Sequence, residues 1–194
     1  MKLVIITAGM LLLAGAGGLN AQTPSTPTPV VAKPLEIGAA APDFELPAAT
    51  RYGVLREPIK LSDFKGKTVV LAFFPRARTS GCTVQMRTYR DQYEKLFNSG
   101  QNIVLIAISA DTPEVLASWA KDDQFQFVMA SDKELKIATT YGALSTRPGS
   151  TNRNLFVVGP DGNIAYRAVP FREIDATSYV ALGEAIRKLQ PANQ

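Results

Sequence analysis

The sequence predicts an α/β protein with a mixed central β-sheet that carries helices on both faces. Two continuous apolar runs, residues 68–74 and 102–110, have the composition of strands buried on both faces. Between them, residues 83–98 carry apolar side chains near helical spacing, and Gly100 just past their end is a typical helix stop. A strand, a helix and a second strand of this kind form a βαβ unit, in which the two strands lie parallel.

The rest of the chain continues the alternation of strands and helices. Asp111 and Thr112 precede Pro113, an arrangement typical of a helix start. The sequence Gly-Pro-Asp-Gly at residues 159–162 predicts a hairpin turn between two strands. In chain order the predicted elements are a helix to residue 120, a strand at 125–130, a helix at 133–141, strands at 154–158 and 163–169, and a helix at 176–189. Alternation of this kind builds an α/β domain.

The N-terminal residues have the composition of a targeting segment followed by a linker. Residues 1–21 combine Lys2 with an apolar stretch and then small residues up to Ala21, which predicts a cleaved signal peptide. Residues 22–34 are rich in proline and threonine and predict an extended tether, so that residues 35–191 form the domain. The pattern predicts export, to the periplasm or as a secreted protein. The alternative is that residues 1–19 remain as an N-terminal membrane anchor.

The composition excludes several classes of catalytic site. The chain of 194 residues has no histidine and a single cysteine, Cys82. It therefore contains no Ser-His-Asp triad, no Cys-His dyad, no CxxC redox pair and no zinc site of cysteine and histidine. The net charge of +4 is small and no nucleic-acid-binding motif accompanies it, so we expect no nucleic-acid partner. We expect neither a metal nor a cofactor.

Cys82 lies just after a predicted buried strand, at the start of the following helix. The positive end of a helix favours a thiolate by about 0.3 to 2 kcal/mol. Bringing an ordinary thiol pKa from about 8.5 to about 6 needs roughly 3.4 kcal/mol, so the helix alone does not suffice. Without histidine, arginine is the remaining cation of suitable geometry. The arginines close in sequence are Arg76, Arg78, Arg87 and Arg90. The alternative is that Cys82 is a small buried apolar residue beneath a solvated rim of arginines.

Pro75, Thr79 and Cys82 form the spacing Pro-x-x-x-Thr-x-x-Cys, which resembles the peroxidatic motif of the peroxiredoxins, the AhpC/TSA family. The stretch Thr-Ser-Gly-Cys-Thr-Val-Gln at residues 79–85 is most similar to the bacterioferritin-comigratory-protein-like branch of that family. Weaker similarities follow in the family's order at residues 41–46, 61–67 and 160–162. The resemblance implies a thioredoxin-like fold and a thiol-dependent peroxidase, an antioxidant oxidoreductase that reduces hydrogen peroxide and organic hydroperoxides.

The resemblance also implies a role for each residue of the motif. Cys82 would be the peroxidatic nucleophile that becomes a sulfenic acid. The Thr79 hydroxyl would orient thiolate and peroxide, although it could also serve only as a helix N-cap. Pro75 would shield the pocket, although it could also serve only to end a strand. The backbone N–H groups of Gly81 and Cys82 would stabilise charge on the departing oxygen, and Gln85 is a secondary candidate for substrate binding.

The family uses a second arginine from a distant strand. Arg153 is our candidate, because it leads into the turn at Asp161 and Gly162 at an offset similar to that of the family. Arg147, six residues earlier, is the rival. A solvated charge at a strand end is the alternative interpretation of Arg153.

One position departs from the branch that the sequence resembles. Many of its members carry a resolving cysteine five residues after the peroxidatic one, and this chain has Arg87 there. The resemblance therefore implies a one-cysteine enzyme that takes a hydroperoxide as substrate and an external thiol as reductant, either a thioredoxin-like protein or a small thiol. It also leaves room for a homodimer. The alternative functions are a redox sensor and a thioredoxin-like chaperone or binding module with little peroxidase turnover.

Overall fold

The computed structural model describes residues 32–190 of the chain. The predicted signal peptide at 1–21, residues 22–31 of the predicted tether and residues 191–194 lie outside the described part. None of the helices within 32–190 has the length and apolar character needed to cross a membrane.

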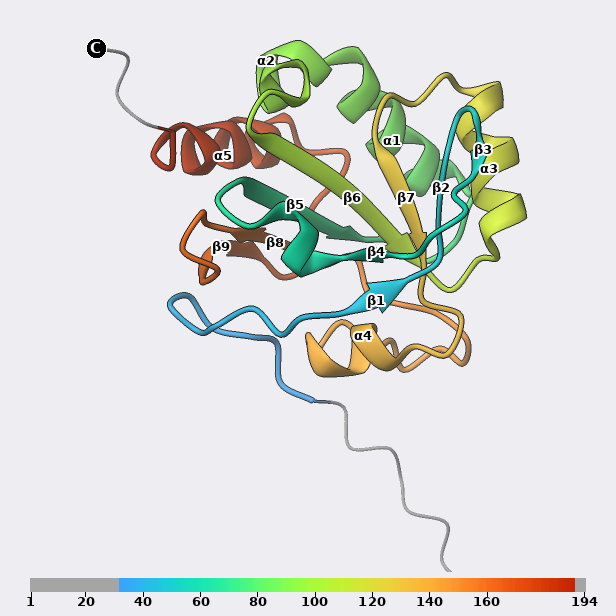
Figure 1. Ribbon diagram of the computed structural model, residues 1–194, viewed down its shortest axis with the longest axis horizontal. Coiled ribbons are helices and arrows are strands. Elements are labelled where there is room, and N and C mark those ends of the chain that lie inside the picture. The colour runs from blue at the N-terminus through green and yellow to red at the C-terminus, as the bar shows by residue number, and fades with distance from the viewer. Residues whose placement is uncertain (1–31, 191–194) are drawn as a thin grey trace, which may run out of the picture.

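A seven-stranded mixed sheet forms the centre of the molecule, in the order β3-β2-β7-β6-β5-β8-β9 (Figure 1). The pairs β5–β6 and β6–β7 are parallel, and every other pair in this sheet is antiparallel. The strands are β2 (Ala48–Thr50), β3 (Gly53–Val54), β5 (Thr68–Phe73), β6 (Ile103–Ser109), β7 (Val128–Ser131), β8 (Leu155–Val158) and β9 (Ile164–Ala168). The predicted βαβ unit and the hairpin at residues 159–162 are both present.

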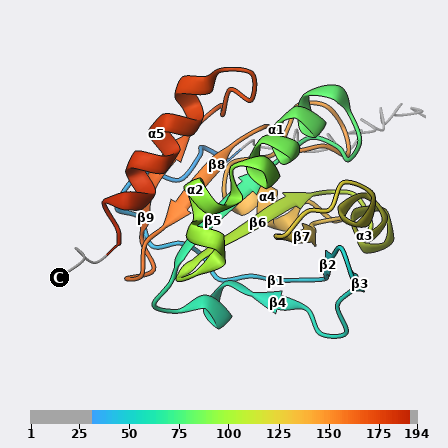
Figure 2. The ribbon, with the colours of Figure 1, turned by 90° about the horizontal axis from the view of Figure 1, so that it is seen from above.

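Helices cover both faces of this sheet, as the sequence predicts (Figures 1 and 2). Side chains of β5 alternate between the faces, with Val70 packed in one buried cluster and Leu71 in the other. The first face carries α1 (Ser80–Asp91), α2 (Tyr93–Phe97), α3 (Pro113–Asp122) and α5 (Ala176–Arg187). The second face carries α4 (Lys136–Thr140) together with the small antiparallel sheet of β1 (Glu45–Leu46) and β4 (Ile59–Lys60). Two short 3-10 helices, Leu61–Phe64 and Asn98–Gly100, complete the elements.

The single helix predicted at 83–98 is wrong in its bounds. Helix α1 begins earlier, at Ser80, and the helical path breaks at Gln92 (φ −108°, ψ 19°) before α2. With this break, the buried rings of Tyr89 and Phe97 meet edge to face, with centroids 5.6 Å apart. Apolar spacing marks the residues that enter the core, but it does not reveal that two short helices rather than one deliver them.

Two other predicted elements start three residues later than expected. The strand predicted from residue 125 starts at Val128, because Phe125 and Phe127 stack on each other in the core at 5.0 Å between ring centroids instead of joining the ladder. The helix predicted from residue 133 starts at Lys136, where Asp132 accepts hydrogen bonds from the N–H groups of Ile137 and Ala138. This capping carboxylate sets the start of α4.

The first described residues are fixed to the domain beside α4. The guanidinium of Arg167 on β9 donates to the carbonyl oxygens of Pro34 (3.2 Å) and Leu35 (2.9 Å). Gly142, just after α4, has φ +64°, and a Cβ there would lie 2.4 Å from the nitrogen of Pro34. The close approach of two backbones therefore requires glycine at this position.

Candidate active site

Cys82 occupies the first turn of α1, directly after the loop that leaves β5. The first bond of the helix runs from the N–H of Thr83 to the carbonyl oxygen of Thr79 (2.8 Å). The N–H groups of Gly81 and Cys82 precede that bond, and groups at this position of a helix lack an intrahelical acceptor. The thiol therefore lies at the positive end of the helix dipole, as the sequence predicts.

Side chains from neighbouring segments fix the loop between β5 and α1. The carboxylate of Asp111 accepts hydrogen bonds from the N–H of Ala77 (2.7 Å) and the hydroxyl of Ser109 (2.8 Å). The hydroxyl of Thr151 donates to the carbonyl oxygen of Phe74 (2.8 Å). The helix start predicted at Pro113 is confirmed, with Thr112 at the N-cap position, while the carboxylate of Asp111 serves the loop that precedes Cys82.

Arg153 lies next to the thiol. It precedes β8, and both of its Nη atoms donate to the Sγ atom of Cys82 at 3.6 Å. Nη1 also donates to Oε1 of Gln85 (2.5 Å), and Nε forms an ion pair with Oε2 of Glu173 (3.1 Å). Cys82 and Gln85 are fully buried, and 14% of the Arg153 side chain is exposed. A guanidinium that faces a sulfur with two N–H groups favours the negatively charged form of that sulfur.

The amide of Gln85 connects this group to Tyr89. Its Nε2 atom donates to the Tyr89 hydroxyl oxygen (3.0 Å), while its Oε1 atom accepts from Arg153. Because arginine can only donate, this arrangement fixes which end of the amide faces the guanidinium. Burial raises the pKa of the Tyr89 hydroxyl well above its usual range, so the phenol stays neutral.

Next to Cys82 lies an open pocket of about 700 Å³. Its wall includes Pro75, Thr79, Gly81 and Arg153, while Cys82 itself is fully buried beside Gly81. The backbone of Thr79 is at the N-cap position of α1, but its hydroxyl donates to the carbonyl oxygen of Arg76 (3.0 Å) rather than capping the helix. The expected side-chain cap is thus absent at this threonine.

The other arginines singled out from the sequence lie farther from the thiol. Arg147 is exposed and lines the same pocket, so Arg153 rather than Arg147 contacts Cys82. Arg76 also lines the pocket. The remaining three form surface ion pairs, Arg78 with Asp122, Arg87 with Asp123 and Arg90 with Asp91.

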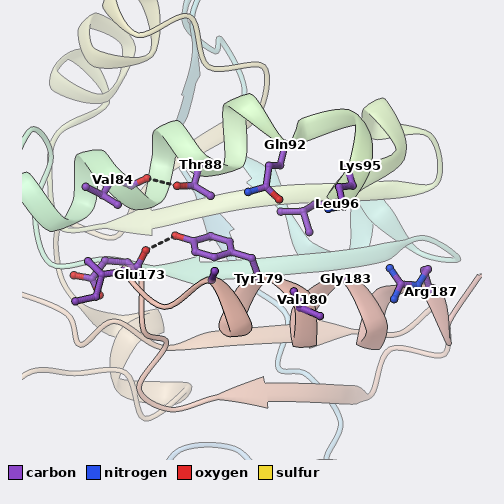
Figure 3. Close-up of a pocket in the computed structure, with 12 residues that line it drawn as sticks. Val84, Thr88, Gln92, Lys95, Leu96, Glu173, Tyr179, Val180, Gly183 and Arg187 are labelled. Carbon is purple, nitrogen blue, oxygen red and sulfur yellow. Dashed lines mark hydrogen bonds between the residues drawn. The ribbon is translucent and has the colours of Figure 1, made fainter.

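Sequence reasoning missed Glu173, the partner of Arg153. It lies in the segment between β9 and α5, where no motif or spacing marks it. Its carbonyl oxygen accepts a hydrogen bond from the Tyr179 hydroxyl (2.8 Å). Figure 3 shows this bond as the dashed line between Glu173 and Tyr179. Glu173 and Val84 line both the pocket and a second groove of about 690 Å³. Figure 3 shows that this groove runs between α1–α2 and α5 towards Lys95 and Arg187.

The fold and the site together define a class of protein. A lone cysteine at a helix N-terminus, after a central strand of a mixed sheet and beside an arginine, is the arrangement of a thiol-dependent oxidoreductase with a thioredoxin-like fold. A model of the AhpC/TSA family matches residues 37–167. The chain belongs to this family, and its single cysteine agrees with a one-cysteine peroxiredoxin, a thiol-dependent peroxidase.

Individual relatives agree with the family. The chain is 32% identical over 139 residues to peroxiredoxin Bcp of Escherichia coli, an alignment that covers 69% of this chain and 85% of the relative. It is 28% identical to peroxiredoxin Bcp of Bacillus subtilis, over 82% of this chain and 98% of the relative. Among solved structures, peroxidoxin BcpB of Mycobacterium tuberculosis has a TM-score of 0.70 and 25% identity, covering 81% of this chain and 99% of that one.

Proposed function

We propose that this chain reduces hydrogen peroxide and organic hydroperoxides outside the cytoplasm, with Cys82 as the peroxidatic nucleophile. The observation that carries the proposal is the pair of Nη atoms of Arg153, each 3.6 Å from Sγ at the N-terminus of α1. The helix stabilises the thiolate by only about 0.3 to 2 kcal/mol, so a cation in contact with the sulfur must supply the rest of the stabilisation. Arg153 provides it.

In the first step the Cys82 thiolate attacks the terminal oxygen of the peroxide. A sulfur–oxygen bond forms, the oxygen–oxygen bond breaks, and the departing oxygen takes up a proton to leave as water or an alcohol. The sulfur is oxidised by two electrons to a sulfenic acid, and the peroxide is reduced by the same two electrons. Negative charge moves from sulfur to the departing oxygen during this step.

The residues of the pocket are assigned roles that follow this movement of charge. Arg153 stabilises the thiolate and then the developing oxyanion, because its N–H groups can serve both. The N–H groups of Gly81 and Cys82 donate to the departing oxygen from the helix terminus. Thr79 and Pro75, which line the pocket, orient the peroxide and exclude water from it. Gln85 holds Arg153 in place through Nη1.

The second step needs a thiol from another molecule, because the chain has no second cysteine. That thiolate attacks the sulfenic sulfur, water leaves, and a mixed disulfide forms. A further thiol of the reductant then releases Cys82. We propose a thioredoxin-like protein or a small thiol as reductant. A homodimer is also part of the proposal, and the mass of the purified protein in solution tests it.

Peroxide consumption with dithiothreitol as reductant tests the function. Wild-type protein should turn over hydrogen peroxide and cumene hydroperoxide, and Cys82→Ser should not. The Ser variant is the matched control, since it replaces one atom in the fully buried residue. If wild-type Cys82 is oxidised once and is not recycled by any thiol, the proposal fails and the redox-sensor alternative stands.

A further inference from the structure

The orientation of Arg153 depends on more than the residues of the peroxidatic motif. A guanidinium group is planar, so two fixed contacts at its edge determine where its remaining N–H groups point. Here Nη1 donates a hydrogen bond to Gln85, Nε forms an ion pair with Glu173, and both Nη atoms face Sγ. We propose that Glu173 is a positioning residue for peroxide reduction, one that acts by aiming the guanidinium of Arg153 at Cys82. This inference rests on the function proposed above.

Arg153 and Glu173 form a mostly buried ion pair, which can hold the guanidinium in one orientation. The side chains are 14% and 22% exposed, respectively, and Nε lies 3.1 Å from Oε2. Solvent screens a pair at this depth less than it screens an exposed one. The other arginine pairs around α1 involve more exposed arginine side chains, such as that of Arg87 at 53%. Exposed pairs of that kind do little to hold a side chain in one orientation.

Glu173 is itself held from two sides. The Tyr179 hydroxyl donates to its main-chain oxygen at 2.8 Å, and Tyr179 is buried in α5. Its carboxylate packs over Gly81, where an added Cβ would lie 2.5 Å from Oε1 of Glu173 and 3.0 Å from Nη2 of Arg153. The absence of a side chain at Gly81 thus leaves the space in which carboxylate and guanidinium meet beside the thiol.

The negative charge of Glu173 does not by itself favour catalysis at Cys82. The charged residues that line the pocket, among those the structure describes, are Arg76, Arg147, Arg153 and Glu173. Tyr89 and Tyr179, the nearest other titratable groups on α1 and α5, are neutral because burial raises the pKa of each. A carboxylate beside Arg153 offsets part of the positive field and so disfavours the thiolate. Its benefit to catalysis is therefore orientation of the guanidinium.

Two substitutions separate orientation from charge. Glu173→Gln removes the charge but keeps a side chain of the same length with an oxygen beside Nε, whereas Glu173→Ala removes both the charge and the oxygen. The Gln variant should retain most of the rate with peroxide, and alkylation of Cys82 by iodoacetamide should set in at lower pH than in wild type. The Ala variant should lose about 10- to 100-fold in the rate with peroxide, the size of loss found when a residue that orients a metal-ligating side chain is removed.

The experiment measures the second-order rate with hydrogen peroxide across pH, up to the plateau where the thiol is fully ionised. At that plateau Glu173 no longer affects the fraction of thiolate, and neither Ala nor Gln carries a charge, so a deficit of Ala relative to Gln reports orientation. Glu36→Gln is the matched control, since it removes a carboxylate that pairs with Arg167 on β9. Thermal unfolding checks that all variants are folded.

Equal plateau rates for Ala and wild type would overturn the inference, as would a Gln variant as slow as Ala. Failure of the proposed function looks different, because wild-type protein would then reduce no peroxide. In that case the pH dependence of Cys82 alkylation by iodoacetamide still tests whether Glu173 positions Arg153. Alkylation of the Ala variant should set in at higher pH than that of Gln, and identical profiles would overturn it.

Discussion

Arg153 is the residue on which the reactivity of Cys82 depends most directly. Its planar group contacts sulfur through two nitrogen atoms at 3.6 Å. Arg153→Ala should therefore reduce the rate with peroxide at pH 7 by about tenfold or more and move the alkylation profile to higher pH, because the thiolate loses its cation. Arg153→Lys should restore only part of the rate, since an ammonium cannot present two N–H groups in a plane.

Stopped-flow kinetics with hydrogen peroxide measures this effect. Arg147→Ala is the control, because Arg147 lines the same pocket but is exposed. It should retain nearly all of the activity. Wild-type kinetics in Arg153→Ala would refute the assignment and transfer it to Arg147.

Gly81 supports a second prediction at the scale of single residues. Its φ is not in the left-handed region, so the requirement for glycine is spatial rather than conformational. A Cβ at 2.5 Å from Oε1 of Glu173 must displace that carboxylate and, with it, Arg153. Gly81→Ala should slow peroxide reduction while leaving the denaturation midpoint close to that of wild type, because alanine is a better helix former than glycine. A Gly81→Ala enzyme with full activity would contradict the close packing described.

Among the elements, the loop between β5 and α1 owes its position to the segment after β6. Asp111→Ala would leave the N–H of Ala77 without its acceptor, which should cost about 1 to 3 kcal/mol of unfolding free energy. Urea denaturation measures this cost, and peroxide kinetics should show a slower enzyme as the loop before Cys82 loosens. Asp122→Ala is the control: Asp122 forms an exposed pair with Arg78, and its loss should cost less than about 1 kcal/mol. Equal costs for the two variants would contradict the role given to Asp111.

The geometry of helix α1 determines whether a second cysteine at position 87 could form a disulfide with Cys82. Cys82 is buried, whereas Arg87 is exposed and paired with Asp123, so the two side chains leave the helix on different sides. Their Cα atoms should be about 8 to 9 Å apart in a regular helix, beyond the roughly 7 Å limit for a disulfide. We expect that Arg87→Cys nevertheless forms an 82–87 disulfide after one equivalent of peroxide, because the first turns of a helix can open locally.

Mass spectrometry detects that disulfide as a loss of about 2 Da, against a gain of about 32 Da if Cys82 is overoxidised to the sulfinic acid. Arg87→Ser is the matched control, since it loses the same ion pair without gaining a thiol. If Arg87→Cys overoxidises as readily as Arg87→Ser, the start of α1 is too rigid to open.

The parts of the fold that local sequence encodes could be predicted, and the parts that distant contacts create could not. Continuous apolar runs predict β5 and β6 because both of their faces are buried. The break at Gln92 has no such signal, since the apolar spacing continues across it. The spacing of Pro75, Thr79 and Cys82 locates the site at the loop between β5 and α1 and the first turn of α1. Glu173 escapes prediction because only the tertiary fold brings it to Arg153.

For the whole molecule, the N-terminal sequence predicts the cellular location of the protein. We expect the mature protein to begin at or near Gln22 and to be found outside the cytoplasm, because residues 1–21 have the pattern of a cleaved signal peptide. Intact-mass measurement on the protein recovered from an exporting host decides this. Recovery of a chain that still starts at Met1 in the membrane fraction would favour the anchor instead.

The backbone contact between Gly142 and Pro34 determines from which side the domain can be held. Together with Arg167, it fixes the start of the described chain beside α4. Cys82 belongs to α1, which packs on the other face of the sheet. A support, fusion partner or affinity bead attached upstream of Ala32 would therefore be joined on the α4 side. A reductant as large as a folded protein could still approach from the side of α1 and α5, so immobilisation through the N-terminus should preserve turnover.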